Sequence, residues 1–264
     1  IRPLYEKYLK PDFQASPVLA FFDRSDKIPD EVLWKIRLAM KQKLIRFARQ
    51  RLVDQALRRG GIPSEIEDAN TALDPNALTI GFARRFATYK RAPLIFRDAK
   101  RLAKILNNPG RPVQILFAGK AHPNDINVGR YLYGGCDVWL NNPLRPQEAS
   151  GTSGMKPPLH GGVNFSILDG WWPEGFDGKN GWAIGDGTQL ADLEKQNAKD
   201  AAEIYAKLEK QIVPMFFDRD AKGLPRRWLK MAKHSMATVC RQFSTHRMLK
   251  DYWETFYSKA HAGT

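Results

Sequence analysis

The residues best suited to chemistry lie in two loops, and each loop follows an apolar run that resembles a buried strand. The first loop runs from Arg84 to Arg91, directly after ALTIGF, and holds four basic residues. Arginine offers phosphate a planar fork of donors, and lysine offers a mobile point charge. Most basic runs are only solvated loops, but a place after a strand favours anion binding.

The second loop is EASGTSGMK, from Glu148 to Lys156. Its small residues lead towards an expected helix from Met155 onward, and backbone N–H groups in such a turn bind phosphate. Lys156, just beyond the turn, is placed to form a Schiff base with an aldehyde cofactor whose phosphate occupies it. An ordinary Gly/Ser loop with a surface lysine is the alternative, and composition alone favours it.

A third motif, GKAHP, follows another apolar run and contains His122. This histidine is either a catalytic or sugar-contacting residue, or a loop residue with a structural hydrogen bond. The sequence leaves both open.

The elements that must position these loops form an α/β pattern. Short apolar runs alternate with helical segments, which is typical of a parallel sheet covered on both faces. Ligands of such doubly wound sheets bind at the carboxyl ends of the strands. The predicted strands are Ala77–Phe82, Val113–Ala118, Asp137–Leu140 and Val163–Leu168.

Helices flank this sheet, and we expect three parts in the chain. Residues 1–75 form a helical linker segment packed on the domain, with a helix over Asp30–Arg59. Residues 76–198 form a Rossmann-like cofactor- and phosphate-binding core, in which Gly178–Gly187 reads as a turn-rich connection. Residues 199–264 add the C-terminal helices, whose last segment, Thr245–Tyr257, carries aromatic residues that we expect in the core.

Composition excludes several classes of protein. The chain has 42 basic and 28 acidic residues in 264, a net charge of +14, but the basic residues are dispersed and accompany no nucleic-acid module. No apolar run is long enough to span a membrane. Two distant cysteines, Cys136 and Cys240, have no metal-ligand spacing. We therefore expect a cytoplasmic protein without nucleic acid, membrane or metal, although Ile1 is a doubtful natural start.

Several motifs together resemble the α-glucan (glycogen/starch) phosphorylases of the short bacterial and archaeal type. EASGTSGMK is similar to their pyridoxal-phosphate attachment signature, and GFARRFATYKRA to the phosphate-binding stretch upstream. GKAHP, DVWLNNPLRPQ, NFSILDGWWPEGFDGKNGWAIGDG and the tail GLPRRWLKMAKHSMATVCRQFSTHRM resemble the family in the same order. The likeness covers nearly the whole chain.

This resemblance implies the C-terminal half of a two-domain GT-B glycosyltransferase, which converts α-1,4-glucan and inorganic phosphate to glucose 1-phosphate once an N-terminal domain completes it. Lys156 would hold pyridoxal 5'-phosphate, and Arg85 and Lys90 would bind the substrate phosphate. These three residues are the expected catalytic set. The cofactor phosphate would be held by Arg84, Arg85, Thr152, Ser153 and Gly154, and the sugar by Glu148, Gly151 and Thr152.

The sequence also departs from the family. The upstream domain is absent, and so is a helix-and-strand unit after GKAHP that carries a tyrosine lying against the cofactor. Pro157-Pro158 follows Lys156, where a helix would lose a backbone hydrogen bond, and His160 replaces the usual asparagine. These departures bear on cofactor affinity more than on the fold.

Two other functions stay open. A glycogen-synthase-like transferase of the same architecture would share the basic pair and the acid near a Gly-rich turn, but it needs no Schiff-base lysine. A degenerate module that binds glucan or polyanions without turnover is the second alternative.

Overall fold

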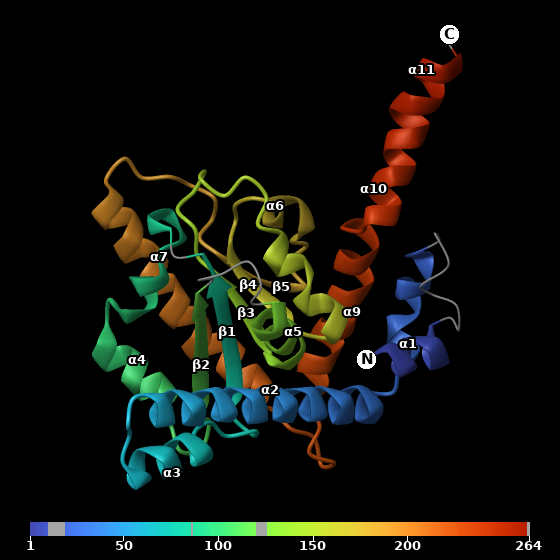
Figure 1. The fold of residues 1–264 in the computed structure, drawn as a ribbon. Helices are drawn as coiled ribbons and strands as arrows, with labels where there is room; N and C mark the ends of the chain where they lie inside the picture. The colour runs from blue at the N-terminus through green and yellow to red at the C-terminus, as the bar shows by residue number, and fades with distance from the viewer. Residues whose placement is uncertain (10–18, 86, 120–125, 263–264) are drawn as a thin grey trace.

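The computed structural model describes residues 1–9, 19–85, 87–119 and 126–262, so His122 lies outside the described residues. A single five-stranded sheet forms its centre (Figure 1), with all strands parallel in the order β2-β1-β3-β4-β5. This confirms the predicted doubly wound α/β fold. The strands are β1 (Leu78–Arg84), β2 (Val113–Gly119), β3 (Val138–Asn141), β4 (Val163–Ile167) and β5 (Gly181–Ile184).

The fifth strand was not predicted. Its sequence GWAI stands between glycine- and aspartate-rich turns, and those turns led to its interpretation as a connecting segment. All four of its residues are buried, and it pairs in parallel with β4. Four residues are too few to show a strand pattern in the sequence, so this strand is recognised only from its burial and pairing in the structure.

Strand order reverses beside β1. The chain passes from β1 outward to β2, then returns across β1 to form β3, β4 and β5 on its other side. At such a switch point the loops after two neighbouring strands diverge and leave room for a ligand. The two loops in question follow β1 and β3.

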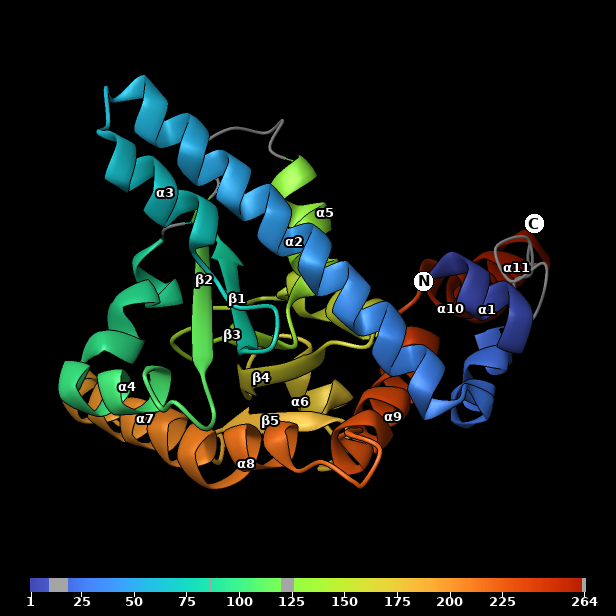
Figure 2. The same ribbon diagram turned by 90° about the horizontal axis from the view of Figure 1, so that it is seen from below.

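One face of the sheet is covered by helices from two distant parts of the chain. Figure 2 shows α7 (Leu193–Lys207) and α8 (Val213–Phe217) end to end along this face, with α4 (Ala99–Leu106) beside α7. Their apolar residues form the largest core cluster with alternate residues of the strands, among them Ile80, Leu140 and Phe165. Burial of this face is the main contribution to domain stability.

The opposite face is covered by α2 (Asp30–Arg58) and α5 (Ile126–Gly135), and α3 (Pro63–Thr71) packs on α2. Glycines allow the end of α5 to lie close to α2, and the residue after α5 to lie close to β1. A Cβ at Gly135 would lie 2.4 Å from Leu44 Cβ, and one at Gly81 would lie 2.5 Å from Cys136 Sγ. Glycine is therefore required at both contacts.

The predicted helix Asp30–Arg59 is confirmed as α2, but its buried face differs from the apolar stripe expected. Arg37 and Lys41 are buried along with Leu33 and Leu44. Lys41 Nζ lies 2.6 Å from Asp137 Oδ2, and Arg37 donates to the backbone oxygens of Gly134 and Cys136, at the end of α5. Charge–charge contacts thus join α2 to the amino-terminal edge of the sheet.

At the β5 side, α9 (Arg226–Gln242) joins the sheet to the N-terminal segments. It packs with α1 (Arg2–Tyr8), the 3₁₀ segment Leu19–Lys27 and the start of α2. Short α6 (Trp172–Gly175) contributes Trp172 to a small cluster with Trp171 and Val239 of α9.

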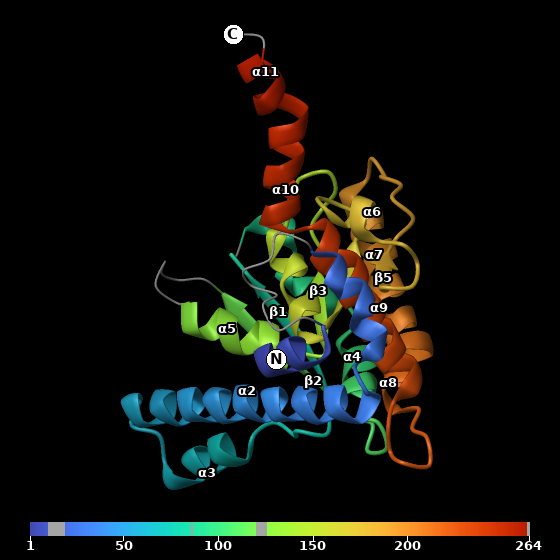
Figure 3. The same cartoon turned by 90° about the vertical axis from the view of Figure 1, so that its right-hand side faces the viewer.

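The tail corrects one prediction. Figures 1 and 3 show α10 (Thr245–Tyr252) and α11 (Ser258–Ala262) as a rod that rises away from the body. The expected burial of the aromatic residues in 245–257 is wrong, because Trp253 is 59% and Phe256 61% exposed, and α10 has no buried residue. Nothing in the described part of the chain reaches far enough to cover them. None of the described helices is long and apolar enough to cross a membrane.

Candidate functional site

The two chemically informative loops meet at the carboxyl ends of β1 and β3. Arg84 is the last residue of β1, and the loop after Asn141, the last residue of β3, returns Glu148 to it. Arg84 NH1 donates to Glu148 Oε2 at 2.5 Å, although the two residues lie 64 positions apart in sequence. The site therefore forms at the switch point of the sheet.

Glu148 joins two of the predicted cations. Besides Arg84, Lys90 Nζ lies 2.9 Å from Glu148 Oε2, and all three residues are buried. Burial raises the pKa of Glu148, but the hydrogen bond from Lys90 and the charge of Arg84 outweigh it and leave that pKa below its ordinary value. The carboxylate is thus ionised at neutral pH, and the trio keeps a net charge of +1.

Arg91, the fourth cation of the first loop, has a structural part that the sequence did not indicate. Its NH2 lies 2.8 Å from Asp200 Oδ2 on α7, and its guanidinium donates to the backbone oxygens of Asn142 and Pro143. The residue itself adopts a left-handed backbone conformation with φ of 48°. Such strain persists only where surrounding contacts enforce it. Arg91 joins the two loops and is not free to bind an anion.

The small-residue turn differs from the expected helix start. Gly151 is left-handed (φ 76°), and a 3₁₀ turn over Thr152–Met155 follows it. A left-handed residue followed by right-handed ones aims successive N–H groups to one side, which is an arrangement that binds anions. The prediction of an α-helix from Met155 onward is wrong, because the chain forms two short 3₁₀ turns instead.

The prolines after Lys156 explain this geometry. Pro157 and Pro158 occupy the first positions of the second turn, Pro157–His160, where a backbone N–H is not required. The turn closes on left-handed Gly161, and the N–H of Gly162 donates to the oxygen of Pro157 at 2.9 Å. The expected loss of an intrahelical hydrogen bond therefore does not occur.

Lys156 lies beside an aromatic ring. Its Nζ donates to the backbone oxygen of Thr152 at 3.1 Å and lies 5.4 Å from the ring centroid of Tyr133, on α5. Lys156 is exposed, but desolvation by the neighbouring groups lowers the pKa of its amine from its ordinary value. A larger neutral fraction makes the amine a better nucleophile towards an aldehyde.

Other predicted residues lie around this centre. Arg84 NH2 is 3.3 Å from Ser153 Oγ, which joins the basic cluster to the small-residue turn. Arg85 and Thr152 are exposed. The structure thus brings Arg84, Lys90, Glu148, Gly151 and Ser153 into one contiguous group, with Lys156 at its rim and Arg85 on the adjoining surface.

The turn is held from below by the loop after β4. Glu148 N donates to Asp169 Oδ2, and Trp171 N donates to the oxygen of Ser150, both at 2.9 Å. Gly154 has no room for a side chain, since a Cβ would lie 2.9 Å from Asn164 Oδ1. These supports fix the turn before any ligand arrives.

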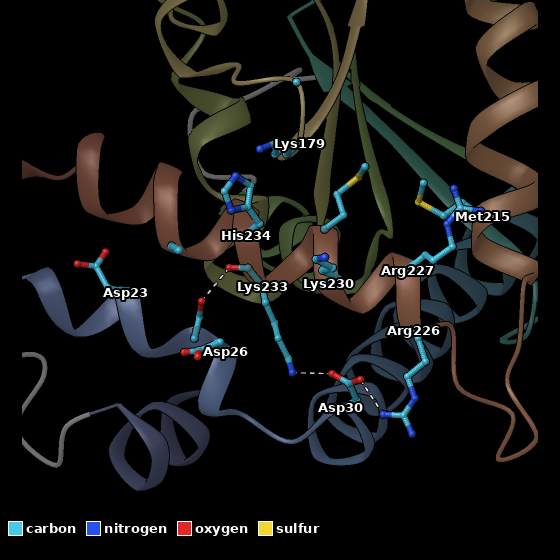
Figure 4. A pocket seen from close by; sticks show the side chains of 14 residues that line it. Asp23, Asp26, Asp30, Lys179, Met215, Arg226, Arg227, Lys230, Lys233 and His234 are labelled. Carbon is cyan, nitrogen blue, oxygen red and sulfur yellow. Dashed lines mark hydrogen bonds and ion pairs between the residues drawn. The ribbon is translucent and has the colours of Figure 1, made fainter.

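A cavity lies away from this site. About 930 Å³ in volume, it runs along α9 and includes Lys230, His234 and Asp30 in its wall (Figure 4). Several of its charges are already paired: Asp30 contacts both Lys233 and Arg226, and His234 contacts Asp177. No residue predicted to bind cofactor or substrate lines it.

These features define a doubly wound α/β domain that carries a cation cluster at its switch point, with the Lys156 amine at the rim of that cluster. No family model matches the chain. It is 44% identical to a maltodextrin phosphorylase of Thermococcus litoralis over 89% of this chain and 31% of that protein. It is 41% identical to a glycogen phosphorylase of Aquifex aeolicus over 98% of this chain and 42% of that protein. A glycogen phosphorylase of Mycobacterium tuberculosis is 40% identical over 90% of this chain and 31% of that protein.

Over the part that it covers, the chain is similar to proteins named maltodextrin phosphorylase and glycogen phosphorylase. It spans about a third to two fifths of the length of these relatives. The Aquifex alignment runs over 290 positions but uses 98% of a 264-residue chain, so about 30 aligned positions have no residue here. That number is about the size of the helix-and-strand unit that the sequence leads us to expect is missing, and the alignment does not place it along the chain.

Proposed function

We propose that this chain is the C-terminal, cofactor-carrying half of a pyridoxal-phosphate-dependent α-1,4-glucan phosphorylase of the GT-B architecture. The observation that supports this most is the position of the Lys156 amine. It lies on the loop EASGTSGMK, one turn from Ser153, which contacts the buried Arg84–Glu148–Lys90 cluster. An amine, an anion-binding turn and fixed cations are what a phosphate-bearing aldehyde requires.

The residues present fit that cofactor. Lys156 has a lowered pKa and a flat aromatic neighbour, and the turn after Gly151 presents N–H groups beside Arg84. When bound, pyridoxal phosphate supplies a phosphate whose second pKa, near 6, suits proton exchange with inorganic phosphate. Two phosphates repel each other strongly in a partly dry site, so several cations must offset their charge.

The chain's own residues divide this work. Arg84, with Thr152, Ser153 and Gly154, holds the cofactor phosphate, and Arg85 and Lys90 hold the substrate phosphate. Glu148 accepts hydrogen bonds from a sugar hydroxyl, while Gly151 and Thr152 offer backbone N–H groups to the same sugar. Because Glu148 is ionised and fixed by two cations, it accepts without rearrangement.

We propose that a further domain completes the enzyme, and that the isolated chain has little activity on α-1,4-glucan. The relatives are two to three times as long, and the apolar face of α10 and the following turns stays exposed. Half of a cleft neither orients the acceptor nor excludes water from the reaction. Glucose 1-phosphate formation therefore requires the added domain.

The test is covalent retention of pyridoxal phosphate. We expect the protein to form an absorbing imine that borohydride fixes on Lys156, as located by peptide mass spectrometry. Lys156→Ala should abolish this attachment without unfolding the chain, whereas Lys179→Ala, at an exposed lysine, should leave it unchanged.

Salt separates this proposal from a polyanion-binding module. Specific attachment at Lys156 should survive a salt series that removes nonspecific contacts. Equal reducible cofactor in the Lys156→Ala variant, or binding that disappears uniformly with salt, would refute the assignment.

A further inference from the structure

Tyr133 is held in a fixed place beside the reactive amine. It lies on α5, and its ring centroid is 4.7 Å from that of Trp139 on β3, at an interplanar angle of 39°. Trp139 is completely buried, so Tyr133 has a rigid wall behind it. The ring is only partly buried, and Lys156 Nζ lies 5.4 Å from its centroid.

The hydroxyl of the same residue lies in the field of the cation cluster. Burial raises the pKa of Tyr133, and the nearby charge of Arg84 only partly opposes this. The phenol therefore stays protonated and neutral at physiological pH. Tyr133 thus offers an uncharged aromatic face beside the amine of Lys156.

We propose that Tyr133 is a positioning residue, whose ring forms the stacking wall for a flat aromatic aldehyde joined to Lys156. The inference rests on the proposed function in one respect, the attachment at Lys156. A ring joined to this amine starts at an atom 5.4 Å from the Tyr133 centroid, so its own centroid can reach the 4.5–7 Å centroid separation at which aromatic pairs attract. Tyr133 therefore selects aromatic over aliphatic aldehydes at that lysine.

The test compares two simple probes, pyridoxal and propanal, on the full chain. The Lys156 amine condenses with either aldehyde, a C=N bond replaces the C=O bond, and water leaves. Borohydride then transfers a hydride to the carbon while the nitrogen takes up a proton. Peptide mass spectrometry gives the labelling of Lys156 relative to that of exposed Lys179 in the same molecule.

We expect wild-type Lys156 to prefer pyridoxal over propanal, relative to Lys179. Tyr133→Leu should reduce this preference about two- to tenfold, the range that an aromatic pair contributes beyond its buried area. Tyr133→Phe keeps the ring and should retain the preference. Loss of the packing on Trp139 alone would change labelling of Lys156 by both aldehydes alike and would leave the preference unchanged.

Two results would overturn the proposal. One is a wild-type Lys156 that does not distinguish the two aldehydes, a measurement that needs no variant to fold. The other is an unchanged preference in Tyr133→Leu. Failure of the proposed function has a different signature. If no phosphate site exists, Lys156 should retain pyridoxal and pyridoxal phosphate equally, and substitutions at Tyr133 should not change that ratio.

Discussion

At the scale of single residues, the site places like charges close together before any ligand binds. Arg84 and Lys90 are both buried, and each contacts the same carboxylate of Glu148. A buried cation without a partner is costly, so Glu148 is needed to hold both in place. A bound anion would share these cations with Glu148, which ties anion binding to the position of the carboxylate that we propose binds the sugar.

His160 predicts a pH dependence of stability. Burial and the charge of Arg37 lower its pKa from 6.5 to about 4, and its Nδ1 has no hydrogen-bond partner among the described residues. Between these pH values the unfolded chain binds more protons than the folded one. Stability therefore falls as the pH drops through this window, by about 1–2 kcal/mol between pH 7 and pH 5.

We expect His160→Asn to remove most of that dependence. Urea unfolding at the two pH values measures it, and His246→Asn, at an exposed histidine, is the matched control that should keep the wild-type slope. An undiminished slope in His160→Asn would show that other groups carry the effect.

At the scale of elements, the sequence predicted those strands and helices that have a clear local pattern of apolar residues. Four strands and α2 were recognised from apolar runs and helical spacing, and both functional loops were placed at strand ends. The short strand β5 was missed because its four residues carry too little pattern. The helix after Met155 was wrong because two prolines begin a separate turn there.

The sequence could not predict which charged residues of the site form ion pairs. Arg84 and Glu148 are 64 residues apart, and Arg91 meets Asp200 on a helix that the pattern only located roughly. A cation in a basic run forms an internal ion pair only if the fold places a carboxylate opposite it, and the sequence does not show that. Roles in the site therefore stay predictions until ligand binding is measured.

The attachment of α2 gives a stability prediction. Asp137 is 1% exposed and neutralises Lys41 while also contacting Arg37. Asp137→Asn leaves two buried cations without a counter-charge, so we expect a loss of about 3–5 kcal/mol in the free energy of unfolding. Urea denaturation measures it.

A second substitution checks the cause. Lys41→Met in the Asp137→Asn background should recover part of the loss, because it removes one of the stranded charges. Lys43→Met, at an exposed lysine of the same helix, should change stability by no more than about 0.5 kcal/mol. No recovery in the double variant would mean that the uncompensated charge of Lys41 is not the cause of the loss.

At the scale of the whole molecule, a well-packed sheet domain continues into a rod with an uncovered apolar face. The exposed residues Leu249, Trp253 and Phe256 recur at helical spacing and lie on the face of one rod. An exposed apolar stripe of this kind marks an interaction surface. In the proposed enzyme, the further domain is the element that would cover it.

The final prediction follows from this separation of rod and body. Because α10 buries none of its residues, the double substitution Leu249→Ser and Trp253→Ser should change the free energy of unfolding of the domain, measured with urea, by no more than about 0.5 kcal/mol. The same change removes exposed apolar surface from the rod. Any self-association of the chain through this face, measured by sedimentation velocity, should therefore decrease. Lys250→Ser, an exposed polar site on α10, serves as the control and should alter neither quantity. A loss of more than about 1 kcal/mol in the double variant would mean that the rod packs on the body in solution, and the exposed face would then be no surface for a further domain.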